Sequence, residues 1–357
     1  MLLWTLLVGC WPNDGERASL DFSAIPYDNA DVVDSGALIS FFDGDRLCPD
    51  GERNRTIALF RDDLPDPAPV AIIYHAGAFD FIFDELGDLN DPSFYNPGRL
   101  NRGWAVGKAW ETLGLNLNIP DAAEENEGAL AAALLNAGVA QIYPTNCWGD
   151  FWHNDPEIRP NDLDVEVFER SGFTVANDAL RLVTDEAFAN EQDFQIPVEL
   201  DQSQIYLIGL GSGSRAVTEI LLTTAAADVA GVLVDSPPDL LSAYIDPLDP
   251  FDEEEEGLRR IYGELALPSI DDQSLQTLAG DDALPARVGM IWSDADPRLP
   301  QGSVAPTAET LAGLPGAWVY NQRRPVHVSV NGDLELATGA VEYLLTGTIP
   351  QIEDDAR

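Results

Sequence analysis

The chain has 357 residues, of which 45% are hydrophobic and 23% are charged, a composition that suits one large folded domain and excludes a disordered chain. Its 19 Lys and Arg residues stand against 62 Asp and Glu residues, which gives a formal net charge of -43. Such a charge repels nucleic acid and anionic membrane surfaces, so neither is expected as a partner.

The first ten residues are apolar and end in Leu7-Val8-Gly9-Cys10, a pattern that resembles a bacterial lipoprotein signal with Cys10 as the lipidated residue. The stretch is far shorter than the ~20 residues of a membrane-spanning helix and lacks the positive residues of a typical signal. We expect residues 1–20 to be a signal and tether, with a hydrophobic N-terminal strand as the alternative. The protein would then lie outside the cytoplasm, in the periplasm or on the cell surface, and contact a bacterial membrane only through this lipid.

The other two cysteines, Cys48 and Cys147, form an even pair that can become a disulfide in an oxidising compartment. Two unrelated buried thiols are the alternative, because sequence alone does not give their distance. No spacing typical of a zinc site is present, and no metal or cofactor is expected.

Short apolar runs bounded by turn residues predict strands, and segments with helical spacing alternate with them. Strands are expected at residues 37–42, 56–60, 70–74, 139–143, 205–208, 231–235, 288–292 and 318–320. Helices are expected at residues 102–113, 129–136, 175–189, 215–225 and 334–345. This alternation predicts one α/β domain over residues 21–357, with a mostly parallel sheet of about eight strands flanked by helices.

Two long segments, residues 144–172 and 237–285, interrupt the pattern and are predicted to be lid-like insertions over one edge of the sheet. Trp148 and His153 lie in the first and are expected to line a pocket. The second contains the acidic run 252–256, which we expect to be solvated, although a calcium site is the alternative. The acidic residues as a whole are spread along the chain, which is typical of a solvated surface; attraction of cations or basic partners is the alternative.

The most informative segment, residues 201–214, reads Asp-Gln-Ser-Gln-Ile-Tyr-Leu-Ile-Gly-Leu-Gly-Ser-Gly-Ser and indicates a buried strand, a sharp turn and a helix start. It resembles the nucleophile elbow of the α/β-hydrolases, Gly-x-Ser-x-Gly, with Gly209 and Gly213 as the flanking glycines. The nucleophile position then falls on Gly211, which has no side chain to form an acyl-enzyme. The backbone there usually has φ > 0, which glycine accepts without strain, so the turn is expected to survive. Ser212 is the candidate substitute nucleophile.

The loop after the strand at 70–74 supplies candidate donors for an oxyanion hole. It reads His-Ala-Gly-Ala and resembles the His-Gly-Gly-Gly loop of lipases and esterases. The resemblance implies that the backbone N–H groups of Ala76, Gly77 and Ala78 line the oxyanion hole together with that of Ser212. His75 is then expected to face the pocket.

The acid and the base of a catalytic triad have candidates in the order typical of hydrolases. After the strand at 288–292, Ser-Asp-Ala-Asp resembles the family's Gly-x-x-Asp turn, with Ser293 in place of Gly and Asp296 at the position of the acid. His327 follows the last strand and precedes the last helix, which is where the family keeps its catalytic base.

The resemblance spans residues 37–345 and implies an esterase- or lipase-like ancestry. With glycine at position 211, we expect a protein that binds an ester, acyl or peptide-like small molecule, or has an accessory role, without cleaving it. The alternative is an active hydrolase of carboxylic esters or peptide-like acyl substrates, in which Ser212 attacks or His327 activates a water molecule. Gly209-x-Gly211-x-Gly213 also resembles a nucleotide or S-adenosylmethionine loop, but it lies deep in the chain and Leu207 stands where such a loop has an acidic residue.

Overall fold

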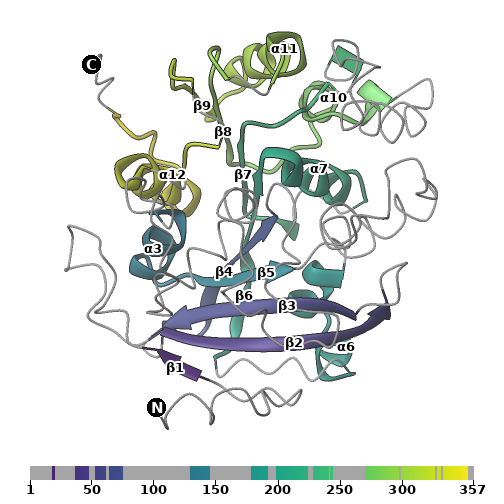
Figure 1. Ribbon diagram of the computed structural model, residues 1–357, viewed down its shortest axis with the longest axis vertical. Helices are drawn as coiled ribbons and strands as arrows, with labels where there is room; N and C mark the ends of the chain where they lie inside the picture. The colour runs from purple at the N-terminus through teal and green to yellow at the C-terminus, as the bar shows by residue number, and fades with distance from the viewer. Residues whose placement is uncertain are drawn as a thin grey trace, which may run out of the picture.

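The computed structural model describes residues 18–20, 37–47, 53–61, 64–74, 129–144, 178–191, 198–223, 228–240, 242–243, 270–296, 299–325, 328–330 and 333–352. These residues build a central sheet with helices on both of its faces (Figure 1). The predicted α/β class is therefore confirmed.

Within the described ranges, the sheet has nine strands in the order β1-β2-β3-β5-β4-β6-β7-β8-β9. The six strands from β5 to β9 in this order are parallel, whereas β1, β2 and β3 add an antiparallel edge. All eight expected strands are present. The bounds are β1 (Ala18–Leu20), β2 (Ala37–Leu47), β3 (Arg53–Arg61), β4 (Ala68–Tyr74), β5 (Ala140–Pro144), β6 (Leu200–Leu210), β7 (Gly231–Asp235), β8 (Val288–Trp292) and β9 (Trp318–Asn321).

The ninth strand, β1, was not expected and lies within the segment assigned to the tether. It pairs with β2 through Ala18↔Ile39, Ser19↔Leu38 and Leu20↔Ala37. Within the described residues, the sheet begins at Ala18, two residues before the expected end of the tether.

The helices predicted at 129–136, 215–225 and 334–345 are present, and the one predicted at 102–113 lies outside the described residues. The structure adds two helices that the sequence pattern did not indicate, α10 and α11. No helix in the described ranges is long and apolar enough to cross a membrane. The bounds are α3 (Ala129–Asn136), α6 (Glu186–Glu191), α7 (Ser214–Thr223), α10 (Leu275–Gly280), α11 (Gln301–Ala312) and α12 (Leu334–Thr346), with short 3-10 turns η7 (Gly211–Gly213) and η9 (Ile270–Gln273).

The side chains of the central strands alternate between two apolar layers, as the period of two in a strand requires. In β4, Ala71 and Ile73 face the layer of α3 and α12, while Val70 and Ile72 face the layer of α7, α10 and α11. Figure 1 shows α3 and α12 on one side of the sheet and α7 and α10 on the other. Burial on both faces explains why these parallel strands are continuous apolar runs in the sequence.

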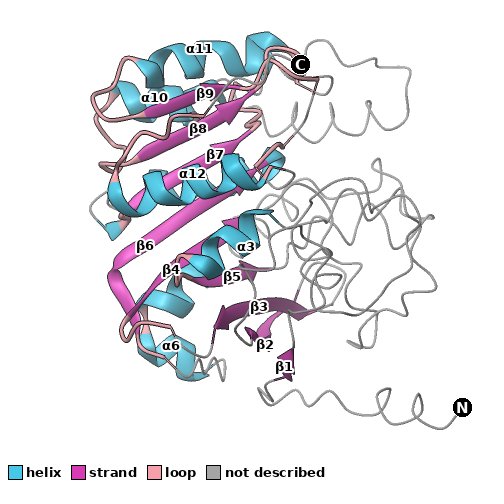
Figure 2. Ribbon diagram, turned by 90° about the vertical axis from the view of Figure 1, so that its left-hand side faces the viewer, coloured by secondary structure: helices cyan, strands magenta, loops and turns pink. Residues whose placement is uncertain are grey.

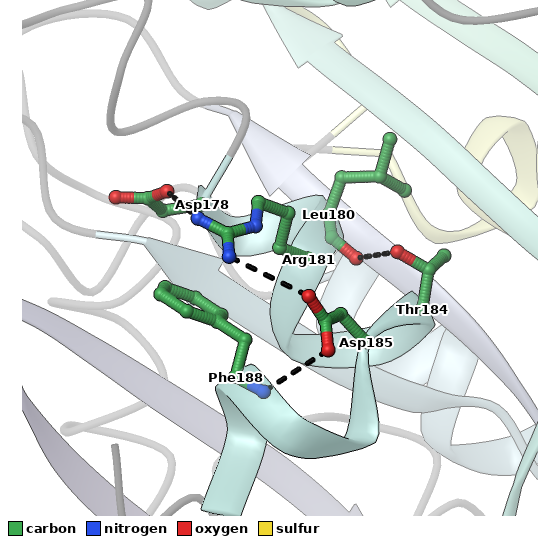
Figure 3. Close-up of polar contacts among 6 residues, drawn as sticks. All are labelled: Asp178, Leu180, Arg181, Thr184, Asp185 and Phe188. Atoms are coloured by element: carbon green, nitrogen blue, oxygen red, sulfur yellow. Dashed lines mark hydrogen bonds and ion pairs between the residues drawn. The ribbon is translucent and has the colours of Figure 1, made fainter. Parts of the chain in front are cut away.

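The helix predicted at 175–189 is interrupted at Asp185: residues 178–184 are helical and α6 begins one residue later. The Asp185 carboxylate accepts the Phe188 N–H at 3.1 Å, which stabilises the start of α6 and holds the pKa of this carboxyl below its usual range. Figure 3 shows Arg181 between Asp178 and Asp185, with both N–O distances at 3.5 Å, and its guanidinium lies 3.8 Å from the Phe188 ring centroid.

The C-terminal helix is tied to the sheet by Tyr343, whose side chain is fully buried. Its hydroxyl accepts the Val288 N–H at 3.0 Å and lies 2.9 Å and 2.8 Å from the carbonyl oxygens of Val288 and Gly316. A single hydroxyl therefore joins α12, the start of β8 and the turn before β9. Figure 2 shows α12 over the face of the sheet, running roughly along β7.

Candidate functional site

The chain changes direction across the sheet between β4 and β6. From β4 it crosses to β5 on one side and then returns as β6 on the other side of β4. In parallel sheets, ligands bind beyond the carboxyl ends of the strands at such a switch point. Here Tyr74, the last residue of β4, lies opposite Gly209 of β6, so the carboxyl ends of these two strands lie side by side at this edge of the sheet.

The turn between β6 and α7 depends on Gly209. A Cβ atom at this position would lie 2.5 Å from the Ser214 Cα and 2.9 Å from the Ser214 N, far closer than an ordinary contact. The first turn of α7 therefore packs directly on the end of β6, which only glycine permits. This is the tight strand-to-helix turn that the sequence predicted.

Gly211 is the first residue after β6, is buried, and has a φ of +53°, as expected for that position of the turn. The 3-10 turn η7 and helix α7 follow it, so the N-terminus of a ten-residue helix lies at this edge of the sheet. Free N–H groups and the positive end of a helix dipole favour a negatively charged oxygen at such a place.

The turn after β8 contains Asp296, the expected acid. Ser293 organises this turn: its hydroxyl accepts the Ala295 N–H at 3.1 Å and donates to the Arg324 carbonyl oxygen, while its own carbonyl accepts the Asp296 N–H at 3.3 Å. The Gln322 N–H also donates to the Trp292 carbonyl oxygen at 2.9 Å. The turn that carries Asp296 is thus bonded to the segment that follows β9.

A buried carboxylate, Asp235, ends β7 at the same level of the sheet. It lies opposite Leu210, which precedes Gly211, and opposite Ile291, which precedes the turn that carries Asp296. Its Oδ2 accepts the backbone N–H groups of Ser329 and Val330, both at 2.7 Å. Residues 328–330, which directly follow His327, are therefore bonded to the carboxyl end of β7.

A second buried carboxylate, Asp239, follows in the same loop. It accepts the N–H groups of Leu275 at 2.8 Å and Gln276 at 3.2 Å, and the Thr307 hydroxyl at 2.7 Å. Burial raises the pKa of Asp239, although these hydrogen bonds and the charge of Arg215 act in the opposite direction. Asp239 thereby fixes α10 and α11 beside the candidate site.

The structure brings Gly211 and the turn of Asp296 to one edge of the sheet, and of Ser212 it describes only the backbone. The second insertion is described at 237–240, 242–243 and 270–285, and the acidic run 252–256 lies outside these ranges. No group of three or more His, Cys, Asp or Glu side chains in the described ranges is placed to hold a metal ion. The remaining predicted residues lie outside the described part of the chain: Cys10, Cys48, His75, Ala76, Gly77, Ala78, Cys147, Trp148, His153 and His327.

Sequence reasoning missed the two buried carboxylates. The sequence pattern places Asp235 only at the end of a predicted strand and Asp239 only within a predicted insertion. The one signal available was an acidic residue closing an otherwise apolar strand, Gly-Val-Leu-Val-Asp. Its partners lie 94 and 95 residues further along the chain, a distance that local patterns do not reveal.

No protein-family model and no curated protein sequence matches this chain. Among solved structures, an esterase from Pyrobaculum calidifontis matches with a TM-score of 0.49 and 14% identity over 87% of this chain and 86% of its own. An acylaminoacyl peptidase from Pyrococcus horikoshii matches with a TM-score of 0.48 and 14% identity over 88% of this chain and 43% of its own. The chain spans 35% to 43% of the length of such peptidases. The mostly parallel sheet flanked by helices and the glycine-dependent turn between β6 and α7 are consistent with the α/β-hydrolase fold that the sequence predicts.

Proposed function

We propose that this protein has esterase-like ancestry, carries Gly211 at the position of the nucleophile, and binds an ester, acyl or peptide-like small molecule without forming an acyl-enzyme. The observation that carries the proposal is the backbone of Gly211, which has a φ of +53° between β6 and α7. A serine at this point would present its Oγ above the sheet edge, whereas glycine offers no atom for a covalent intermediate.

The donors of the site do not depend on the missing hydroxyl. The N–H groups of η7, at the start of this helical segment, are the proposed donors, and they belong to the backbone rather than to a side chain at position 211. Donors that polarise the carbonyl group of a bound molecule contribute to its affinity. Without a nucleophile, the bound molecule is not cleaved. This combination supports a binding or accessory role.

The test is hydrolysis of short- and medium-chain p-nitrophenyl esters by the purified chain, beside Gly211→Ser and Gly211→Ala. Alanine is the matched control because it adds the same Cβ at a positive φ, at a strain of about 1–2 kcal/mol, but brings no hydroxyl. We expect the wild type and Gly211→Ala to be inert and Gly211→Ser to hydrolyse the esters. A fluorophosphonate should label Gly211→Ser alone, with the expected increase in protein mass.

Activity of the wild-type chain would overturn the proposal and favour the active hydrolase. Its loss in Ser212→Ala would then identify a serine nucleophile. Its loss in His327→Ala with Ser212→Ala unaffected would identify a water molecule activated by His327. An inert wild type with an inert, unlabelled and folded Gly211→Ser would show that the edge is not a degenerate hydrolase site.

We extend the proposal to the location of the protein, with Cys10 carrying a lipid outside the cytoplasm. The support is the sequence Leu7-Val8-Gly9-Cys10 and the polar residues after it. Detergent phase partition of cell extracts should place the wild type in the detergent phase and Cys10→Ser in the aqueous phase. Aqueous partition of both would contradict a lipid anchor.

A further inference from the structure

We propose that Arg323 and Arg324 bind the carboxylate of an acyl or peptide-like ligand whose carbonyl group lies at the turn of Gly211. This inference rests on the proposed function and narrows its ligands to those that carry a free carboxylate. It assigns a role to two adjacent cations, which the sequence pattern did not single out, in a chain with a formal net charge of -43.

The two arginines differ from the other arginines whose side chains the structure describes. Arg181 and Arg215 form ion pairs with acidic residues close to them in sequence, and Arg287 donates to backbone carbonyl oxygens of α12. Arg323 and Arg324 are exposed, and neither guanidinium has an ion pair or a hydrogen bond with any residue that the structure describes. Their charge is therefore available to a ligand.

The backbone that carries the pair is fixed although its side chains are exposed. The Arg323 N–H donates to Oδ1 of Asn321, the last residue of β9, at 3.0 Å. The Arg324 carbonyl oxygen accepts the Ser293 hydroxyl, which belongs to the turn after β8. Both arginines therefore start from backbone positions that the sheet determines, and a ligand would have to order only their side chains.

Two local features are unfavourable for the free protein. Arg323 has a φ of +53°, in the left-handed region that a non-glycine residue seldom adopts. The neighbouring Gln322 has a buried Oε1 without a hydrogen-bond partner in the described part of the chain. Backbone strain of this kind gathers at ligand-binding positions, and a buried polar atom without a partner is rare in native proteins. Both features are typical of a site that a ligand completes.

One row of the sheet joins this turn to the turn of Gly211. The row consists of Leu210 in β6, Asp235 in β7, Ile291 in β8 and Tyr320 in β9. Gly211 directly follows the first of these residues, and the two arginines follow the last by three and four positions. All four strands are parallel, so both turns lie at the carboxyl edge of the sheet, where such sheets bind ligands.

The strand spacing sets the size of the ligand. Three spacings of ~4.8 Å separate β6 from β9, which gives roughly 14 Å between the two turns. An arginine side chain that extends toward Gly211 covers roughly half of this distance, and about two residues of extended chain, at ~3.3 Å each, cover the rest. The ligand carboxylate therefore lies about two residues, or an acyl chain of the same length, from the carbonyl group.

Guanidinium groups suit a carboxylate because each can donate two parallel N–H groups to its two oxygens. The acidic chain as a whole repels anions. A ligand carboxylate is therefore favoured only where cations lie together without acidic partners, which is the situation of Arg323 and Arg324.

The test is calorimetric titration of the full chain with N-acetyl-dialanine and with its C-terminal amide. The two probes have the same length and differ only in the terminal charge. We expect the wild type to bind the acid about tenfold more tightly than the amide, and to lose this preference as the salt concentration rises. The double variant Arg323→Gln, Arg324→Gln should bind both probes with the affinity that the wild type has for the amide.

Arg181→Gln is the matched control, because it removes a positive charge from a side chain that is also exposed, at 43%. It should leave the preference for the acid unchanged, whereas Arg323→Gln and Arg324→Gln should each lower the affinity for the acid about threefold or more. Urea midpoints confirm that the variants fold. The inference would be overturned by equal affinities of the wild type for acid and amide, by absence of binding of either probe, or by a double variant that keeps the preference.

A kinetic arm separates this inference from the proposed function. In a Gly211→Ser background, the double arginine variant should raise KM about tenfold for p-nitrophenyl hydrogen suberate at a nearly constant kcat, and leave p-nitrophenyl octanoate unaffected. An inert Gly211→Ser with the expected preference for the acid probe would refute the proposed function and leave the carboxylate site standing. An active Gly211→Ser that treats both esters alike, with no preference for the acid probe, would do the reverse.

Discussion

Replacement of Gly209 by alanine should destabilise the protein strongly, because the added methyl group has no room. Its Cβ would lie 2.5 Å from the Ser214 Cα, 2.9 Å from the Ser214 N and 3.0 Å from the Val217 Cγ2. Two of these atoms are backbone, so α7 and the end of β6 must separate by about 1 Å to reach ordinary contact distance. We expect a loss of about 3 kcal/mol or more in the free energy of unfolding, measured by urea titration with tryptophan fluorescence.

Gly280→Ala is the matched control for this prediction. Gly280 is the last residue of α10, is exposed, and has no atom within 4 Å of the position that its Cβ would take. Alanine there should leave stability unchanged or raise it by up to about 1 kcal/mol, since alanine favours helix over glycine. Equal urea midpoints for Gly209→Ala and the wild type would show that α7 does not pack on β6 as described. That result would also refute the assignment of Gly211 to the tip of the turn.

Two further predictions concern buried polar groups. Asp239→Asn should lower the free energy of unfolding by about 1–3 kcal/mol at neutral pH, because an amide offers one acceptor oxygen to donors that now bond two. Burial raises the pKa of Asp239 in the folded protein above its ordinary 3.8. The contribution of Asp239 to stability is therefore complete below pH 3.8 and declines as the pH rises through the folded pKa. Urea titrations at several pH values should show the wild type losing stability relative to Asp239→Asn between these two pKa values. Tyr343→Phe should cost about 1–2 kcal/mol in the same assay by leaving the Val288 N–H without its acceptor, and an unchanged midpoint would contradict the described hydroxyl contacts.

The central strands were predictable because a strand that is buried on both faces consists of consecutive apolar residues. All seven residues of β4 and all five of β7 are buried, and the sequence located both. The sequence did not predict β1, because it is a three-residue edge strand with one pairing partner. α11 escaped because Gly302 and Pro306 lie within it, and both residues weaken a helical pattern.

The candidate site was predictable where its chemistry depends on neighbours in sequence. The glycines at 209 and 211 predict the turn, because position 209 requires close approach of the Ser214 backbone and position 211 requires a positive φ. The contacts of Asp235 were not predictable, because its hydrogen-bond partners Ser329 and Val330 lie 94 and 95 residues further along the chain. Long-range hydrogen bonds of this kind follow from the sheet order, which periodicity in the sequence does not give.

The positive φ values at this edge of the sheet indicate a rigid backbone around the proposed ligand site. Gly211, Ser236 and Val328 all hold positive φ values. The Ser236 hydroxyl donates to the Asp235 carboxylate and accepts the Val328 N–H. A site held in one arrangement before its ligand arrives loses less conformational entropy on binding, so it gains affinity. Affinity gained in this way requires no nucleophile. The same rigidity would place a serine side chain at position 211 without further change in the turn. The single substitution Gly211→Ser therefore tests whether the proposed binding site becomes a hydrolase site.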